Sequence, residues 1–179
     1  EALAALDLSG FVLKKDSPSC GLERVKVFEA GQMPIRNGTG LFASALIARF
    51  PLLPVEEEGR LHDPRLRENF IERIFAYRRL VTLFSSRWTT GGLVAFHTAH
   101  KLTLLAHAPE AYRSLGRLVA QAAAVPRAEL RTQYADGFMT ALRAIATRGR
   151  HTNVLRHMAG YFRDLVDAGS RAELTDVID

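Results

Sequence analysis

Apolar residues in the second half of the chain recur at steps of three and four, the spacing that gives a helix one buried face. The pattern holds from residue 64 onward, where no strand is expected. Asp63-Pro64, Thr89-Thr90 and Ala108-Pro109 supply starts for three of these helices. The expected helices cover residues 65–84, 89–107, 108 to Pro126, 128–146, 152–166 and 170–179.

The first fifty residues instead carry short apolar runs that glycine and proline interrupt. Residues 1–8 should end a helix, 11–13 form a buried strand, 25–28 an extended piece and 41–49 a helix. Residues 31–40 are expected to be turns, and residues 51–64, with the acidic run Glu56-Glu57-Glu58, a connector. Together the two patterns predict an α+β fragment, in which a C-terminal piece of an α/β domain is followed by an all-α helical bundle.

The change of pattern also suggests domain limits. We expect the α/β piece at residues 1–58, a connector and long helix at 59–90, and the helical bundle at 91–179. Because the chain begins at Glu1, without Met and inside an apparently helical stretch, we expect it to be a fragment. No apolar run approaches the roughly 18 residues that cross a bilayer, so no membrane partner is expected. The single cysteine cannot form an internal disulfide, and a cytoplasmic location is expected.

Positive charge is concentrated in one part of the chain. The whole sequence carries a net charge of +5, but the span from Arg73 to Arg163 holds 14 basic and three acidic residues, a net charge of +11. All of these bases except Lys101 are arginines, whose planar guanidinium suits phosphate and stacks on nucleobases. Such a span would attract a nucleic acid, whereas solvated helix faces are the structural alternative.

The loop SPSCG at residues 17–21 is the first candidate for chemistry. It follows the expected strand at 11–13, and the nearby bases Lys14, Lys15 and Arg24 would stabilise a thiolate at Cys20. Such a thiolate could act as a nucleophile or as a metal ligand, although a buried structural cysteine is the alternative. Because one cysteine cannot hold a metal or a cluster by itself, further ligands would have to come from elsewhere.

Gly38-Thr39-Gly40 stands directly before the expected helix at 41–49. The free N–H groups at a helix start can hold an anion. The glycines could equally serve only to let the chain bend into the helix.

His97, His100 and His107 fall within about 80° of one another on one expected helix, together with Leu93 and Leu104. The i, i+3 spacing of the first two is compatible with a metal site. No carboxylate joins this face, however, so a polar seam of histidines that hydrogen-bond between helices is the other interpretation.

An arginine-rich turn opens the expected helix at 152–166. Along that helix a basic, amide-bearing side faces away from an apolar side formed by Val154, Leu155, Met158, Phe162 and Leu165. Tyr161 and Trp88 could stack on unpaired bases. The residues expected to contact RNA are Lys101, Arg148, Arg150, His151, Asn153, Arg156, His157 and Arg163.

Two long segments resemble a known pair of domains. Residues 11–58, which contain FVLKKDSPSCG, resemble the C-terminal part of the thiouracil desulfidase family. Residues 91–161, which contain TRGRHTNVLRHMAGY, resemble the helical domain of unknown function that is often fused behind that family. The resemblance implies a fused protein that removes sulfur from 4-thiouridine in transfer RNA, with the helical domain holding the RNA.

The resemblance also implies roles for individual residues. Cys20 corresponds to the third of three cysteines that hold a [4Fe-4S] cluster, and Ser17 to a serine that assists the substrate or a proton transfer. The cluster would leave one iron open to the thiocarbonyl sulfur while water attacks the ring carbon, a non-redox change from C=S to C=O. The family's other two cysteines and its catalytic glutamate have no counterpart in these residues. The isolated chain is therefore expected to hold no cluster and to be inactive.

Two other functions stay open at this point. The chain could be an RNA-binding helical module without chemistry of its own, or part of a desulfidase that acts on free thiouracil. The sequence does not determine the oligomeric state.

Overall fold

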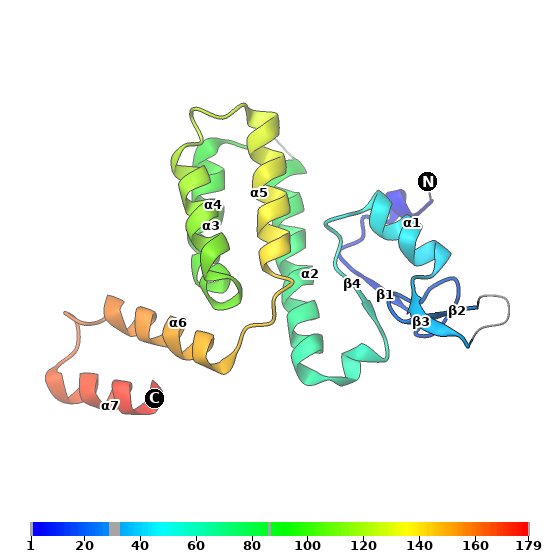
Figure 1. Ribbon diagram of the computed structural model, residues 1–179. Helices are drawn as coiled ribbons and strands as arrows, with labels where there is room; N and C mark the ends of the chain where they lie inside the picture. Colours follow the sequence, from blue (N-terminus) through cyan, green and yellow to red (C-terminus); the bar gives the residue numbers. More distant parts are fainter. Residues whose placement is uncertain (1, 29–32, 86, 179) are drawn as a thin grey trace. The chain divides into compact units, whose positions relative to one another are not determined.

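In the computed structural model, strands occur only in the first part of the chain and helices form the rest of the described residues, which are 2–28, 33–85 and 87–178 (Figure 1). The chain divides into two units, residues 1–86 and residues 87–179. The predicted α+β class, with a helical second part, is confirmed. No helix in the described part of the chain combines the length and apolar character needed to cross a membrane.

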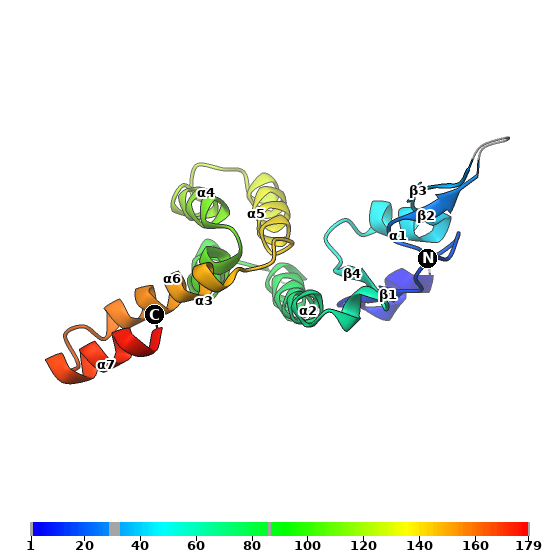
Figure 2. The ribbon, with the colours of Figure 1, turned by 60° about the horizontal axis from the view of Figure 1, so that its bottom comes forward.

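The first unit contains two small sheets. Strand β1 (Phe11–Leu13) pairs in parallel with β4 (Val55–Glu57), and Phe11 lies opposite Val55 in the register. Strand β2 (Val25–Val27) pairs antiparallel with β3 (Ile35–Gly38), and this hairpin projects from the rest of the unit (Figure 2). The remaining elements are a short 3-10 helix η1 (Ala2–Leu6), α1 (Leu41–Arg49), a second 3-10 helix η2 (Arg60–His62) and α2 (Pro64–Ser85).

The first unit closes around a small apolar core beneath the parallel strands. Its buried members come from β1, α1, β4 and the segment that leads into β4; they are Leu13, Ala43, Leu46, Leu53 and Val55. The rings of Phe11 and Phe42 meet at the edge of this core with centroids 5.9 Å apart. The core therefore fixes α1 against β1, the strand that precedes the SPSCG loop.

Three expectations for the first unit differ from the structure. The expected connector at 51–64 contains β4, whose acidic residues are buried rather than solvated. The expected turns at 31–40 contain β3. Residues 31 and 32 of that span lie outside the described residues, and so do residues 1 and 179 of the expected terminal helices. The expected helix at 1–8 is a 3-10 helix over Ala2–Leu6.

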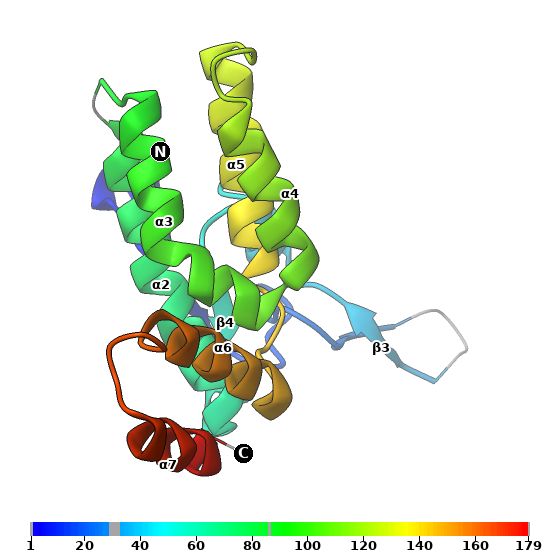
Figure 3. The ribbon, with the colours of Figure 1, turned by 90° about the vertical axis from the view of Figure 1, so that its left-hand side faces the viewer.

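The second unit is built from α3 (Thr90–His107), α4 (Pro109–Ala120) and α5 (Arg127–Ala141), which pack on one another as Figure 3 shows. Thr89 caps α3, because its hydroxyl accepts a hydrogen bond of 3.0 Å from the Gly92 N–H. Of the five apolar positions that periodicity predicts for the helix at 128–146, four are buried and Ile145 is not; the buried ones are Leu130, Tyr134 and Phe138 in α5 and Leu142 just after it. Helix α6 (Arg148–Tyr161) packs on α3, and α7 (Ala168–Ile178) packs on α6.

The ends of two helices differ from those expected. Helix α5 ends at Ala141 instead of residue 146, which leaves Ile145 beyond the helix and 38% exposed. Helix α6 begins earlier than residue 152, because the Thr147 hydroxyl accepts from the Arg150 N–H, and it ends at Tyr161. Arg163 consequently lies in the turn before α7. The predicted apolar side of α6 is buried only at Val154, since Leu155, Met158, Phe162 and Leu165 are exposed.

Candidate functional site

The SPSCG loop forms a compact turn that its own first residue holds together. The Ser17 hydroxyl oxygen accepts hydrogen bonds from the N–H groups of Ser19, at 3.3 Å, and Cys20, at 3.2 Å. The Ser17 carbonyl accepts from the Gly21 N–H at 2.7 Å, which closes the turn. Ser17 therefore positions the cysteine directly, and its hydroxyl hydrogen stays available for donation to a ligand.

The turn rests on the first turn of α1. The Ser19 carbonyl accepts from the N–H groups of Phe42, at 2.9 Å, and Ala43, at 3.2 Å, while the Pro18 carbonyl accepts from Leu41 at 3.3 Å. These are the groups that would have held an anion at this helix start. Because the loop carbonyls already satisfy them, the structure does not favour an anion at this helix start. Gly40 has an ordinary extended backbone, and its lack of a side chain instead allows the loop to approach, since an added Cβ would lie 2.2 Å from the Ser19 carbonyl oxygen.

Cys20 lies at the border between the core and the surface. Its side chain is partly buried and packs against the apolar core of the first unit. The residue is therefore neither fully buried nor fully exposed. The described residues contain no group of three or more His, Cys, Asp or Glu side chains that could hold a metal ion. The residues present thus do not by themselves fit a three-cysteine cluster.

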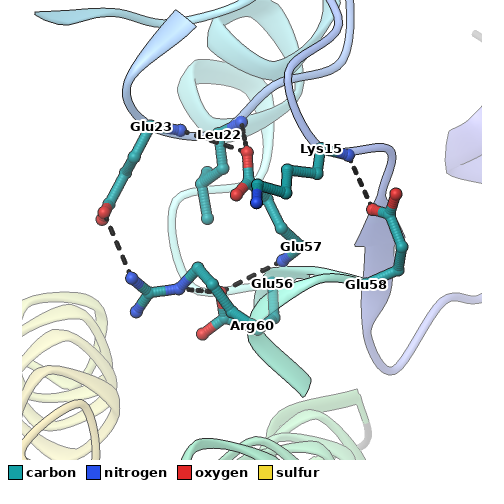
Figure 4. A network of polar contacts seen from close by, with 7 residues as sticks. All are labelled: Lys15, Leu22, Glu23, Glu56, Glu57, Glu58 and Arg60. Atoms are coloured by element: carbon teal, nitrogen blue, oxygen red, sulfur yellow. Dashed lines mark hydrogen bonds and ion pairs between the residues drawn. The ribbon is translucent and has the colours of Figure 1, made fainter. Parts of the chain in front are cut away.

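A network of carboxylates supports the backbone that follows this loop (Figure 4). Glu57, the last residue of β4, is 3% exposed, and its Oε1 accepts hydrogen bonds from the backbone N–H groups of Leu22 at 2.7 Å and Glu23 at 3.4 Å. A buried carboxylate without such donors would be strongly destabilising. Glu57 therefore ties β4 to the backbone that immediately follows Cys20-Gly21.

Glu56 and Glu58 extend the same network. Glu56 is also buried, and its Oε1 accepts from the Arg60 Nε at 2.6 Å, while Arg60 reaches Glu23 at 3.3 Å. Burial by itself lowers the pKa of Arg60, but the hydrogen bond to Glu56 and the surrounding carboxylates raise it overall. The exposed Glu58 accepts from the Lys15 backbone N–H at 2.6 Å. Sequence reasoning did not identify these residues as part of a site. The available signal was the apolar run before Glu56, which follows a strand and a helix and so indicates a second strand that pairs with the first.

The three histidines of α3 form hydrogen bonds to protein groups. His97 Nδ1 lies 3.1 Å from the Tyr134 hydroxyl of α5, and His107 Nδ1 lies 2.5 Å from the Ala144 carbonyl. His100 bonds to the Phe96 carbonyl of its own helix at 2.8 Å and stacks on the Phe96 ring. His97 thus joins α3 to α5, and His107 joins α3 to the segment that follows α5.

We expect the stability of the second unit to fall as the pH is lowered below 6.5. Burial, with smaller contributions from the charges of His100 and Lys101, lowers the pKa of His97 below the ordinary value of 6.5. Between the folded and unfolded pKa values the unfolded chain binds more protons, so stability rises with pH and is fully present above 6.5. Thermal unfolding followed by the fluorescence of the single tryptophan, Trp88, should show this slope, and His97→Gln should reduce it. An unchanged slope in the variant would contradict the assignment.

The residues expected to contact RNA do not form one uniform surface. Lys101 lies over the Tyr161 ring, with Nζ 5.1 Å from its centroid, and Arg150 donates to the His107 carbonyl at 2.7 Å. Trp88 is covered by the Arg127 guanidinium at 4.6 Å, so neither aromatic side chain offers two open faces. The exposed members of the expected set are Arg148, His151, Asn153, Arg156, His157 and Arg163.

Comparison with known proteins gives matches in both units. Residues 1–58 match the family model described as 2-thiouracil desulfurase, and residues 101–179 match the family described as a protein of unknown function, DUF1722. The uncharacterized protein YbgA of Escherichia coli (strain K12) is 35% identical over 116 residues, which are 64% of this chain and 69% of YbgA. No solved structure matches the chain.

Proposed function

Because the chain belongs to the family of YbgA and joins a 2-thiouracil desulfurase region to a DUF1722 region, we propose that it is part of a desulfidase that acts on thiolated uracil in transfer RNA. The reaction would replace a thiocarbonyl by a carbonyl without net electron transfer. The observation that carries the proposal is the SPSCG loop, which lies in the matched region and presents a partly exposed cysteine on a turn that Ser17 braces.

Cys20 would be one thiolate ligand of a [4Fe-4S] cluster whose other ligands come from residues other than these 179. The cluster, when bound, would supply an iron that accepts sulfur. Ser17 would orient Cys20 through its hydroxyl oxygen and donate its own hydrogen to the substrate or to water. With one cysteine in its sequence, the chain by itself should bind no cluster and show no turnover.

The second unit would hold the RNA. Three basic residues, Arg148, Arg150 and His151, stand in the first turn of α6, where the positive end of the helix dipole adds to their charge. Arg163 adds a further exposed guanidinium in the turn after α6. These groups suit backbone phosphates, which carry most of the affinity for RNA but no sequence information. A transfer RNA substrate would place the protein in the cytoplasm.

The decisive experiment incubates the natural full-length protein anaerobically with transfer RNA that contains 4-thiouridine. Loss of 4-thiouridine, measured by nucleoside mass spectrometry, is expected. Unchanged 4-thiouridine in the presence of an intact cluster would contradict the proposal. Activity on free thiouracil without any binding to transfer RNA would favour the desulfidase for small substrates.

We expect RNA binding by this chain to depend steeply on salt and on the exposed arginines of the second unit. Replacing Arg148 and Arg163 together by glutamine should weaken binding to transfer RNA about tenfold at low salt and reduce the slope of log K against log salt by roughly one per lost phosphate contact. Fluorescence anisotropy with labelled transfer RNA measures both quantities. Arg65→Gln, an exposed change on α2, is the matched control. Equal behaviour of the two variants would show that RNA does not contact this region.

A further inference from the structure

The first unit contains a pocket of about 240 Å³ beside the SPSCG loop. Its walls come from the segment after β1, the β2–β3 hairpin and the residues around η2. Four basic side chains line it, those of Lys15, Arg24, Arg36 and Arg60. Sequence reasoning grouped Lys15 and Arg24 near Cys20 but did not add Arg36 and Arg60, because these lie in separate segments of the chain.

The acidic side chains in the same pocket already have partners. Asp16 lies 3.4 Å from Arg36, and Glu23 lies 3.3 Å from Arg60. Glu57 accepts from the backbone of Leu22 and Glu23, as described above. The acids of the pocket are therefore engaged before any ligand enters, and both Arg36 and Arg60 retain further N–H donors.

Two of the pocket's basic side chains have no acidic partner within 4 Å among the described residues. In the described ranges, the Lys15 ammonium and the Arg24 guanidinium have no hydrogen-bonded or ion-paired partner. The stem of Lys15 lies across Gly59, where an added Cβ would come within 2.7 Å of its Cδ. Figure 4 shows this side chain extending toward Glu57, another residue of the pocket wall. The described lining of the pocket thus holds four basic side chains against three acidic ones, Asp16, Glu23 and Glu57.

The backbone also adopts an uncommon conformation at this pocket. Asp16 has a φ of 55° and Arg24 a φ of 61°, in the left-handed region that residues with a Cβ adopt at a cost. Both residues line the pocket. Strained backbone is concentrated at binding and catalytic sites, where it holds a side chain in place.

We propose that this pocket binds a phosphate group. Arginine forks present several N–H donors in a geometry that matches phosphate oxygens. The volume is smaller than the roughly 300 to 1,000 Å³ of pockets for drug-sized ligands, which suits a single phosphate group better than a whole nucleotide.

A second hollow of about 240 Å³ shares Asp16 and Arg36 with the first. Its wall includes Val25 and Phe28, which would give the ribose or base of a nucleotide an apolar surface. The phosphate could therefore be carried by a nucleotide or be free in solution. The site does not depend on desulfidase activity, and the two proposals can fail separately.

The test titrates the purified chain with inorganic phosphate, uridine monophosphate and uridine, followed by calorimetry and by amide shifts of the first unit. Saturable binding of both phosphate-bearing ligands, and none of uridine alone, is expected. Tighter binding of the nucleotide assigns the phosphate to a nucleotide, and equal binding assigns it to free phosphate. Absence of saturable binding at millimolar concentrations of either would overturn the proposal.

Variants locate the site. Arg36→Gln and Arg24→Gly should each weaken phosphate binding about tenfold, the loss of one charge-assisted hydrogen bond. Glycine at position 24 retains the left-handed backbone without strain, so that variant should stay folded. Arg79→Gln, an exposed change on α2 outside the pocket, is the matched control and should bind normally. A loss of binding as large in the control as in the pocket variants would show that the effect is general electrostatic attraction. If the full-length protein removes sulfur from 4-thiouridine but this chain binds no phosphate, the phosphate proposal is overturned and the desulfidase proposal is not.

Discussion

Replacing Gly40 by alanine should lower the free energy of unfolding of the first unit by about 3 kcal/mol, the upper range for forcing an atom into a packed site. A Cβ at this position would lie 2.2 Å from the Ser19 carbonyl oxygen and 2.8 Å from the Cys20 nitrogen. The atoms in the way belong to the backbone, which cannot turn aside as a flexible side chain can. The SPSCG loop would have to move off the start of α1 and break the bonds from Phe42 and Ala43.

Urea unfolding followed by hydrogen–deuterium exchange of residues 11–57 measures this loss. Gly160→Ala is the matched control, because nothing lies within 4 Å of the added Cβ and the position is inside α6. That variant should gain about 0.5 to 1 kcal/mol, since alanine is the better helix former. If the alanine at position 40 were tolerated without loss of protection, the loop would not rest on α1 as described.

Replacing Glu57 by alanine should destabilise the first unit by about 2 kcal/mol. The Leu22 N–H donates to this carboxylate at 2.7 Å in a partly buried setting and would lose its partner. The effect should be felt at the segment after Cys20, because Glu57 is the contact through which β4 holds that segment. Reactivity of the Cys20 thiol toward a maleimide should therefore increase together with the loss of stability.

Two variants separate this role from a general effect of charge. Glu57→Gln retains an acceptor oxygen and should lose less stability than the alanine variant. Glu58→Ala removes the exposed neighbouring carboxylate, whose partner, the Lys15 N–H, can bind water instead; it should change stability by less than about 1 kcal/mol. Equal losses at positions 57 and 58, with unchanged maleimide reactivity, would contradict the bracing role of Glu57.

The helices could be predicted because their signals are local. The run Leu41–Arg49 was predicted with the bounds that the structure shows, and the expected helix at 65–84 differs from α2 by one residue at each end. Periodicity also identified the buried positions of α5. Periodicity placed the end of α5 too late. Leu142 is buried and continues the apolar spacing, but it lies after the last residue of the helix.

Strand β4 was missed because its stabilisation is not local. Three consecutive glutamates indicate a solvated segment when only the sequence is considered. In the fold, Glu56 meets Arg60, while Glu57 meets the backbone N–H of Leu22, a donor that every residue except proline carries. No sequence pattern shows that the Leu22 N–H will be the donor to Glu57, so this pairing can be seen only in the folded chain.

The candidate site could be predicted in part for the same reason. The SPSCG loop was singled out because its punctuation and its lone cysteine are visible in the sequence. The phosphate pocket was not, since its lining depends on which segments β1, the hairpin and η2 bring together. The side of α6 expected to be apolar is largely exposed, because helical periodicity shows where a buried face could form without requiring a neighbour to cover it.

The parallel pairing of β1 with β4 has a consequence for how the first unit acquires its shape. Phe11 lies opposite Val55, so β1 and β4 can pair only after the loop, the hairpin and α1 between them have become compact. Contacts between distant segments form slowly, because the entropy of closing the loop is lost before any contact compensates for it. The turn around Cys20 should therefore settle late in folding, and a molecule that binds there should raise the melting temperature of the whole unit rather than order one loop.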